Sequence, residues 1–270
     1  MQVQIATTNN SALSVNDRGF QYGDGCFSTI AVRHGQPLYW DYHAKRFEQT
    51  LSRLRIDAID FARLRGVVEE QARGLGNSGV IKVTITRGEG GRGYSSAADF
   101  TPNVVITTAM MPPTYATLRE QGIALGLCNT QLGLNPLLAG MKHLNRLEQV
   151  LVRQEIDHQH WQDAVVCNLN GHVVETGIAN LFWEQGNQLY TPDLSLSGVA
   201  GVMRQVIIDQ ANRLNIAISE VAVKPEHLLS VESVFVSNSL MMLVPVIEFN
   251  GHHYKKGKIF SLLAKSLYCD

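Results

Sequence analysis

Two apolar, β-branched runs constrain the fold of this chain more than any other feature. They are VIKVTIT at Val80–Thr86 and NVVITTA at Asn103–Ala109, and each is bounded by glycine or proline. Runs of this kind are typical of buried strands, so we expect two neighbouring strands of one sheet. Apolar residues recur at three- and four-residue steps in Trp40–Leu54 and Phe61–Leu75, which predicts two amphipathic helices. Residues 1–110 are therefore predicted to form a small N-terminal α/β lobe.

The pattern changes after the second run. The pair Pro112-Pro113 can continue neither a strand nor a helix, so we place an interdomain connection at residues 111–120. Residues 121–270 are expected to form a larger C-terminal lobe with mixed β-structure and helices. Its predicted strands are 123–128, 164–169, 172–175 and 233–237, and its predicted helices are 143–159 and 200–215. The pair Asn170-Gly171 indicates a hairpin because both positions tolerate positive φ. The predicted fold class is α+β with two lobes.

The composition limits the kinds of partner. The 270 residues carry a formal net charge of -1, which creates no long-range field that would attract nucleic acid or an anionic membrane surface. We therefore expect a small-molecule substrate. No segment approaches the length needed to span a bilayer, and a cytoplasmic location is expected. The four cysteines show no paired spacing, which favours reduced thiols over disulfides or a metal site. They are Cys26, Cys128, Cys167 and Cys269.

Lys142 is the first candidate for chemistry. It lies in LAGMKHLNRLEQ, between an apolar stretch and the predicted start of a helix. Burial there would favour the neutral amine, and only a neutral amine attacks a carbonyl to form a Schiff base. The alternative is a lysine at a helix start whose amine reaches solvent. Its position alone leaves both interpretations open.

Glu175 is the second candidate. It follows a predicted hairpin strand and begins the segment ETGIANLF. A carboxylate at a strand end can pair with a pyridinium nitrogen and keep that ring protonated, so that the ring withdraws electrons. The alternative is a glutamate that caps the following turn.

Three segments have features of phosphate sites. GVAGVMR at Gly198–Arg204 opens a predicted helix, where unpaired amides and the positive end of the helix dipole meet. Ser237–Ser239 ends a predicted strand and presents further amides. Arg46 of HAKR could grip a phosphate through two parallel bonds, and His43 lies on the same helix face. The respective alternatives are plain turns and a surface charge.

The segment RGEGGRGYS at Arg87–Ser95 directly follows a predicted strand. Its glycines would let the loop approach a ligand closely, and Arg92 and Tyr94 could hold a carboxylate. The segment lacks the strand-turn-helix unit of a dinucleotide site and the lysine of a P-loop. A mobile surface loop is the alternative.

Four signals in one order resemble the fold-type IV pyridoxal-phosphate enzymes. They are DRGFQYGDGCF at Asp17–Phe27, HAKR at His43–Arg46, Lys142, and ETGIANLF at Glu175–Phe182. The resemblance spans Asp17 to about Asn250 and implies the two-lobed fold of the D-amino acid aminotransferases. It also implies pyridoxal 5'-phosphate as the cofactor and a homodimer.

The resemblance assigns roles to individual residues. Lys142 would hold the cofactor and act as the catalytic residue, and Glu175 would be the partner of the pyridine nitrogen. The residues expected at the phosphate are Arg46, Val202, Met203, Asn238 and Ser239. The residues expected at the substrate are Phe27, Arg92 and Tyr94. Many aminotransferases of the group have threonine in place of Met203, so here only the amide of that residue can bind phosphate.

Within the group, RGEGGRGYS and GLNPLLAGMKHLNRLEQVLVR resemble the aminodeoxychorismate lyases. This implies a carbon–oxygen lyase that converts 4-amino-4-deoxychorismate to 4-aminobenzoate and pyruvate in folate biosynthesis. The alternatives are a D-amino acid or branched-chain aminotransferase of the same fold, and a binding protein without a cofactor. An aminotransferase would need a keto-acid acceptor, whereas the lyase would need no second substrate.

Overall fold

The computed structural model describes residues 2–5, 13–57, 59–95 and 100–268. Its chain divides into two compact units. The first contains Met1–Pro112 and Lys142–Asn145, and the second contains Pro113–Met141 and Arg146–Asp270. The short segment Lys142–Asn145 therefore belongs with residues that lie far from it in the sequence, whereas the residues on both sides of it belong to the second unit.

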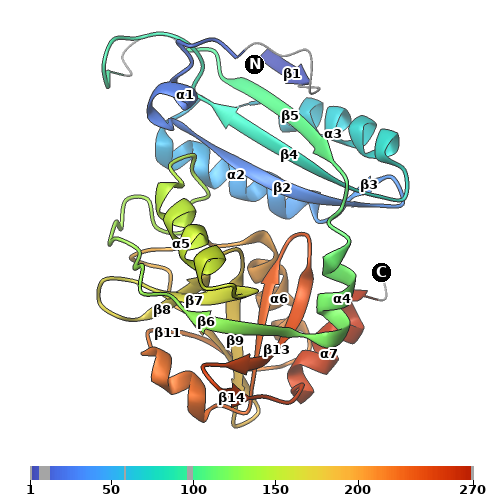
Figure 1. Cartoon of the computed structure of the whole chain (residues 1–270). Coiled ribbons are helices and arrows are strands. Elements are labelled where there is room, and N and C mark those ends of the chain that lie inside the picture. Colours follow the sequence, from blue (N-terminus) through green and yellow to red (C-terminus); the bar gives the residue numbers. More distant parts are fainter. Residues whose placement is uncertain (1, 6–12, 58, 96–99, 269–270) are drawn as a thin grey trace. The chain divides into compact units, whose positions relative to one another are not determined.

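The first unit is a five-stranded sheet against which two long helices pack (Figure 1). In spatial order its strands are β1 (Gln2–Ile5), β5 (Asn103–Ala109), β4 (Ser78–Thr86), β2 (Gly25–Arg33) and β3 (Gln36–Pro37). Strands β4 and β5 are antiparallel neighbours, which confirms the prediction for these two runs. Helices α2 (Trp40–Leu54) and α3 (Phe61–Leu75) have the predicted bounds. They bury Phe47 and Leu64 against Ile30 and Ile81 of the sheet.

The second unit is built on a nine-stranded mixed sheet. Its strands in spatial order are β11 (Ile218–Val221), β10 (Gln188–Pro192), β9 (Asn180–Gln185), β12 (Ser233–Asn238), β13 (Met242–Phe249), β6 (Ile123–Leu127), β7 (Asp163–Cys167) and β8 (Val173–Thr176), and β14 (His252–His253) pairs with β13. Its helices are α4 (Thr114–Gln121), α5 (Leu147–His158), α6 (Val202–Arg213) and α7 (Lys258–Tyr268), and η1 (Pro225–Ser230) is a 3-10 helix. Helix α4 occupies most of the segment predicted as a connection and packs against β13.

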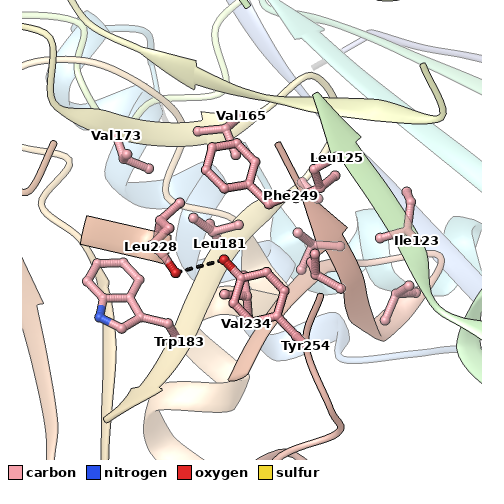
Figure 2. Close-up of a cluster of buried hydrophobic side chains, with 14 of the residues drawn as sticks. Ile123, Leu125, Val165, Val173, Leu181, Trp183, Leu228, Val234, Phe249 and Tyr254 are labelled. Atoms are coloured by element: carbon pink, nitrogen blue, oxygen red, sulfur yellow. Dashed lines mark hydrogen bonds between the residues drawn. The ribbon is translucent and has the colours of Figure 1, made fainter. Parts of the chain in front are cut away.

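The core of the second unit gathers side chains from distant strands (Figure 2). Trp183 and Leu181 of β9 lie fully buried in it, together with Phe249 of β13. The hydroxyl of buried Tyr254 donates a hydrogen bond of 2.7 Å to the carbonyl oxygen of Leu228, so its polar end is satisfied. In the part of the chain that the structure describes, every helix is too short or too polar to cross a bilayer.

Three of the cysteines, Cys26, Cys128 and Cys167, are buried free thiols, and Cys269 lies outside the described residues.

The predicted helix over residues 143–159 begins later in the structure, at Leu147. Residues 143 and 144 pair with β2 instead: His143 forms a β-bridge with Cys26, and the amide of Leu144 donates to the carbonyl oxygen of Gly25 at 3.0 Å. Main-chain pairing with a distant strand has overridden the local preference for helix. The pairing with β2 fixes the main chain next to Lys142.

The predicted hairpin at Asn170-Gly171 joins β7 and β8, which are antiparallel. The predicted hairpin is therefore confirmed, although only Gly171 has a positive φ, of 71°. Asn168 explains the difference, because its side-chain oxygen accepts hydrogen bonds of 3.1 Å from the amides of Asn170 and His172. These bonds support a longer loop with one glycine in the left-handed region.

Glu184 of β9 fastens the C-terminal helix α7. Its side chain is buried, and its two carboxylate oxygens accept hydrogen bonds from the amides of Ile259 (3.0 Å) and Phe260 (2.8 Å). A Cβ atom at Gly257 would lie 1.9 Å from Glu184 Oε1, so only glycine permits this approach. The carboxylate therefore satisfies amides in the first turn of α7 and complements the helix dipole.

We expect Glu184→Ala to lower the free energy of unfolding by about 2–3 kcal/mol, because two amides lose a charged acceptor. Glu184→Gln keeps one acceptor and should lose about half as much. Urea denaturation of the full chain measures both values. Equal losses in the two variants would contradict the capping role.

Candidate active site

Lys142 is held by its main chain against the start of β2. Its carbonyl oxygen accepts a hydrogen bond of 3.0 Å from the amide of Phe27. The lysine is partly buried, and its Nζ atom lies 4.7 Å from the centre of the Phe27 ring. Nζ of Lys82 lies 4.8 Å from the same centre. An aromatic face attracts ammonium groups, so Phe27 helps to fix the position of the Lys142 amine.

Two glycines of the DRGFQYGDGCF segment make this pairing possible. Gly23 has a φ of 66°, and a Cβ atom there would lie 2.3 Å from Oδ1 of Asn145. A Cβ atom at Gly25 would lie 2.3 Å from the carbonyl oxygen of Ile85 in β4. A larger residue at Gly23 would be strained at this φ and would displace the side chain of Asn145, and one at Gly25 would push β2 away from β4. The glycines therefore serve the placement of Lys142.

Asp24 is the centre of a charged cluster that was not predicted. Its carboxylate accepts from Arg18 Nε at 3.0 Å and from Arg87 Nε at 2.8 Å. Arg18, in the short helix α1 (Arg18–Tyr22), also donates to the carbonyl oxygens of Gly93 and Tyr94, at 3.1 and 3.4 Å. The cluster thus ties the glycine-rich loop to α1. These residues belong to the two quoted segments DRGFQYGDGCF and RGEGGRGYS, but nothing in their spacing indicated the contacts between them.

Arg92 and Tyr94 are exposed in this loop. The Tyr94 side chain is 87% exposed, and its ring makes an edge contact with Tyr22 of α1, with 5.4 Å between the ring centres. Arg92 has no ion-pair partner among the residues that the structure describes. The observed contacts of the loop therefore connect it to α1, and the predicted role of both residues at a substrate carboxylate stays a prediction.

Arg46 of α2 reaches a buried polar pair in the first unit. Its Nη2 atom donates to the hydroxyl of Ser28, and that hydroxyl also lies 2.5 Å from Nδ1 of His43. Burial lowers the pKa of Arg46 to about 10. Burial and the charge of Arg46 hold the pKa of His43 well below its usual range, so the imidazole is neutral. His43 and Arg46 share one helix face, as predicted, whereas their contact with Ser28 was not predicted.

In the second unit, Glu175 lies at the end of β8 and is 7% exposed. Its Oε2 atom accepts a hydrogen bond of 2.9 Å from the amide of Val199. Gly140 pairs with the same loop, because its amide donates to the carbonyl oxygen of Gly198 at 3.0 Å. Burial lowers the pKa of Arg146, and attraction to Glu175 partly opposes that shift. Glu175 is thus a buried carboxylate that positions the loop before α6.

The first turn of α6 has no side-chain cap. The helix starts after Gly201, whose amide donates to Oδ1 of Asn180 at 3.1 Å, and Val202 and Met203 are buried in its first turn. A Cβ atom at Gly201 would lie 2.2 Å from Oδ1 of Asn180. Because the first amides of a helix lack partners within it, this end can bind an anion. Asn180 lies in the quoted ETGIANLF segment, but its role there was not predicted.

Asn238 and Ser239 follow at the end of β12. The side chain of Asn238 already shapes the turn, since Oδ1 accepts from the amides of Leu240 and Met241, both at 2.9 Å. Its Nδ2 atom donates to the carbonyl oxygen of Ile178 at 3.2 Å. Because these bonds occupy the side chain, the predicted contact of Asn238 with a phosphate would have to come from its main chain. Ser239 is partly buried.

The family model for amino-transferase class IV matches residues 25–249 of this chain. An aminodeoxychorismate lyase from Vibrio harveyi is 42% identical over 238 residues, which are 86% of this chain and 85% of that protein. The match therefore extends over nearly the whole chain and includes both units.

Solved structures agree with this assignment. A 4-amino-4-deoxychorismate lyase from Pseudomonas aeruginosa superimposes with a TM-score of 0.89 and 38% identity, covering 97% of this chain and 96% of that one. The PLP-bound form of a hypothetical aminotransferase from Mycobacterium tuberculosis has a TM-score of 0.85 at 18% identity, covering 98% of this chain and 94% of that one, and supports the fold alone. The predicted fold-type IV architecture is confirmed. The chain belongs to the class IV aminotransferase family and, within it, to the aminodeoxychorismate lyases.

Proposed function

We propose that this enzyme converts 4-amino-4-deoxychorismate to 4-aminobenzoate and pyruvate, a reaction that serves folate biosynthesis. The observation that carries the proposal is the placement of Lys142, whose main chain pairs with β2 and whose amine lies against Phe27. The identity to lyases from Vibrio harveyi and Pseudomonas aeruginosa supports the choice of substrate.

We propose pyridoxal 5'-phosphate as the cofactor, because the residues of both units suit its chemical groups. The aldehyde suits the amine of Lys142, and the pyridine nitrogen suits the buried carboxylate of Glu175. The phosphate suits Arg46, the uncapped amides of Val202 and Met203, and the turn at Asn238 and Ser239. Met203 offers only its amide. When bound, this cofactor accepts the electrons left on a carbon next to the substrate's amine after a proton is removed.

Lys142 and Glu175 would then have separate roles in the elimination. Lys142 Nζ removes the proton from the ring carbon that carries the amino group, which is general base catalysis. Glu175 stays negatively charged and would keep a proton on the pyridine nitrogen of the bound cofactor. The positive charge of that proton would offset the negative charge left by removal of the substrate proton. The bond between the neighbouring ring carbon and the ether oxygen then breaks, and the enolate that leaves takes up one proton, equal to the one held by Lys142 Nζ, to become pyruvate. The remaining ring becomes aromatic, which makes the reaction effectively one-way.

For the substrate carboxylate we propose Arg92 and Tyr94, with Phe27 beside the reacting amine. The bonds from Arg18 to the loop support this role, because they restrain an exposed, glycine-rich segment. We also propose a homodimer in the cytoplasm, in line with the fold-type IV resemblance. Analytical ultracentrifugation of the purified chain tests the dimer.

Incubation of the purified enzyme with 4-amino-4-deoxychorismate alone tests the reaction. We expect pyruvate and 4-aminobenzoate to form in equal amounts without any added keto acid. An aminotransferase would move the amino group of the substrate to a keto acid, so it would need that second substrate to turn over and would leave the enolpyruvyl ether intact. Loss of substrate that depends on an added keto acid, without release of pyruvate, would therefore refute the lyase and favour the aminotransferase.

A further inference from the structure

Strand β2 serves two groups of residues because successive side chains alternate between its faces. Phe27 lies against Lys142, whereas Ser28 points the opposite way, toward α2. There it meets His43 and Arg46, which are one helical turn apart. Ser28 is 0% exposed and His43 is 1% exposed. The structure thus contains two buried polar side chains, Ser28 and His43, and the partly buried Arg46 on the face of β2 opposite to Phe27.

The direction of the hydrogen bonds follows from the charge states. Arg46 can only donate, so the Ser28 oxygen accepts from it. The hydroxyl proton of Ser28 then needs an acceptor, and neutral His43 provides one at Nδ1. His43 therefore carries its proton on Nε2. That atom is buried and has no hydrogen-bond partner among the described residues.

The unpartnered Nε2 atom of His43 argues against a purely structural role. A buried donor without a partner lowers the stability of the fold, and an apolar residue at this place would avoid that loss. The histidine is useful only at Nδ1, where it fixes the hydroxyl of Ser28. The hydroxyl in turn fixes the guanidinium of Arg46.

No carboxylate pairs with Arg46 within the described ranges. The nearby thiol of Cys26 does not replace one, because burial raises its pKa to about 12 and leaves it uncharged at neutral pH. An uncharged anchor holds the guanidinium in place but does not neutralise it. The full positive charge therefore remains available to an anion.

We propose that Ser28 and His43 are positioning residues that hold Arg46, through uncharged hydrogen bonds, for a phosphate monoester. This inference rests on the proposed function, which makes Arg46 a ligand of the cofactor's phosphate. The inference goes further, because it states that two residues that do not touch the phosphate strengthen the contact between Arg46 and the phosphate. Ser28 and His43 act only through Arg46.

Binding of pyridoxal 5'-phosphate and of pyridoxal, which lacks the phosphate, separates this role from a general effect on folding. Both compounds are titrated into the cofactor-free full chain, whose fold is checked by circular dichroism. We expect Ser28→Ala to weaken binding of pyridoxal 5'-phosphate about tenfold and to leave pyridoxal binding unchanged. His43→Asn, which keeps an acceptor, should bind nearly as the parent does, whereas His43→Leu should behave as Ser28→Ala does.

A double-mutant cycle with Arg46→Met completes the test. In that background Ser28→Ala should have no further effect on binding of pyridoxal 5'-phosphate. Ser233→Ala is the matched control, since Ser233 is a buried serine of β12 whose hydroxyl has no partner among the described residues. It should change neither affinity.

The outcomes distinguish this inference from the proposed function. If Arg46→Met weakens pyridoxal 5'-phosphate binding but neither Ser28→Ala nor His43→Leu does, the positioning role is overturned and the phosphate role of Arg46 stands. Equal weakening for both compounds in Ser28→Ala and His43→Leu would also overturn it, because a disturbed fold affects both. If Arg46→Met itself has no effect, the assignment of Arg46 to the phosphate fails together with the inference.

Discussion

Lys142→Ala is expected to lower the rate of pyruvate release from 4-amino-4-deoxychorismate about 10⁴-fold or more. The variant loses both the covalent attachment of the cofactor and the base that removes the substrate proton. Its fold should persist, because the bonds that place residues 142–145 beside β2 come from the main chain. Pyruvate is measured with a coupled dehydrogenase assay, and borohydride reduction followed by mass spectrometry shows whether the cofactor is joined to the chain.

Lys82→Ala is the matched control for this experiment. Its ammonium lies on the same Phe27 ring at nearly the same distance, 4.8 Å compared with 4.7 Å for Lys142. We expect the control to retain the covalently attached cofactor after borohydride treatment. Near-normal turnover in Lys142→Ala, or attachment of the cofactor to Lys82 in the parent enzyme, would refute the assignment of Lys142.

Glu175→Gln is expected to lower the same rate about 10²–10³-fold, since it removes a preorganised charge from the site. The glutamine keeps the size of the side chain and can still accept the hydrogen bond from the Val199 amide, so the loop before α6 stays in place. Glu175→Ala would lose that bond as well and confuse the two effects. The rate is measured with the cofactor at saturation, so that weaker binding does not contribute.

The control for Glu175 is Glu184→Gln. Glu184 is also a buried glutamate of the second unit that accepts main-chain hydrogen bonds, but its partners are at the start of α7. We expect this variant to lose stability and to keep most of its activity. Similar rates in the two variants would show that the charge of Glu175 has no special part in the reaction.

The periodicity of the sequence was sufficient for the elements whose stability is local. Helices α2 and α3 and strand β5 have the predicted bounds, because amphipathic spacing and β-branched runs act through near neighbours. The family was also readable from short motifs in a fixed order. Glycines in those motifs proved to mark close approaches, as at Gly25 beside the carbonyl oxygen of Ile85.

Contacts between distant segments could not be predicted from the sequence. The start of α5 was predicted too early, because the pairing of His143 and Leu144 with β2 has no local signal. The cluster around Asp24 and the hydroxyl of Ser28 between His43 and Arg46 were missed for the same reason. A single hydroxyl or carboxylate forms no periodic pattern in the sequence. Its role depends on which distant residues the fold places within hydrogen-bond distance of it.

The sequence by itself determined helices α2 and α3 and strands β4 and β5 of the first unit, the amine that is the candidate nucleophile, and the family to which the chain belongs. These properties depend on residue types in runs and on short motifs. Strand β2, which carries Phe27 and Ser28, was not predicted. Only the tertiary structure decided how Lys142 is held against Phe27, how Glu175 is built into the loop before α6, and which uncharged groups hold Arg46. Each of these depends on hydrogen bonds and burial between segments far apart in the chain, whose geometry exists only after folding.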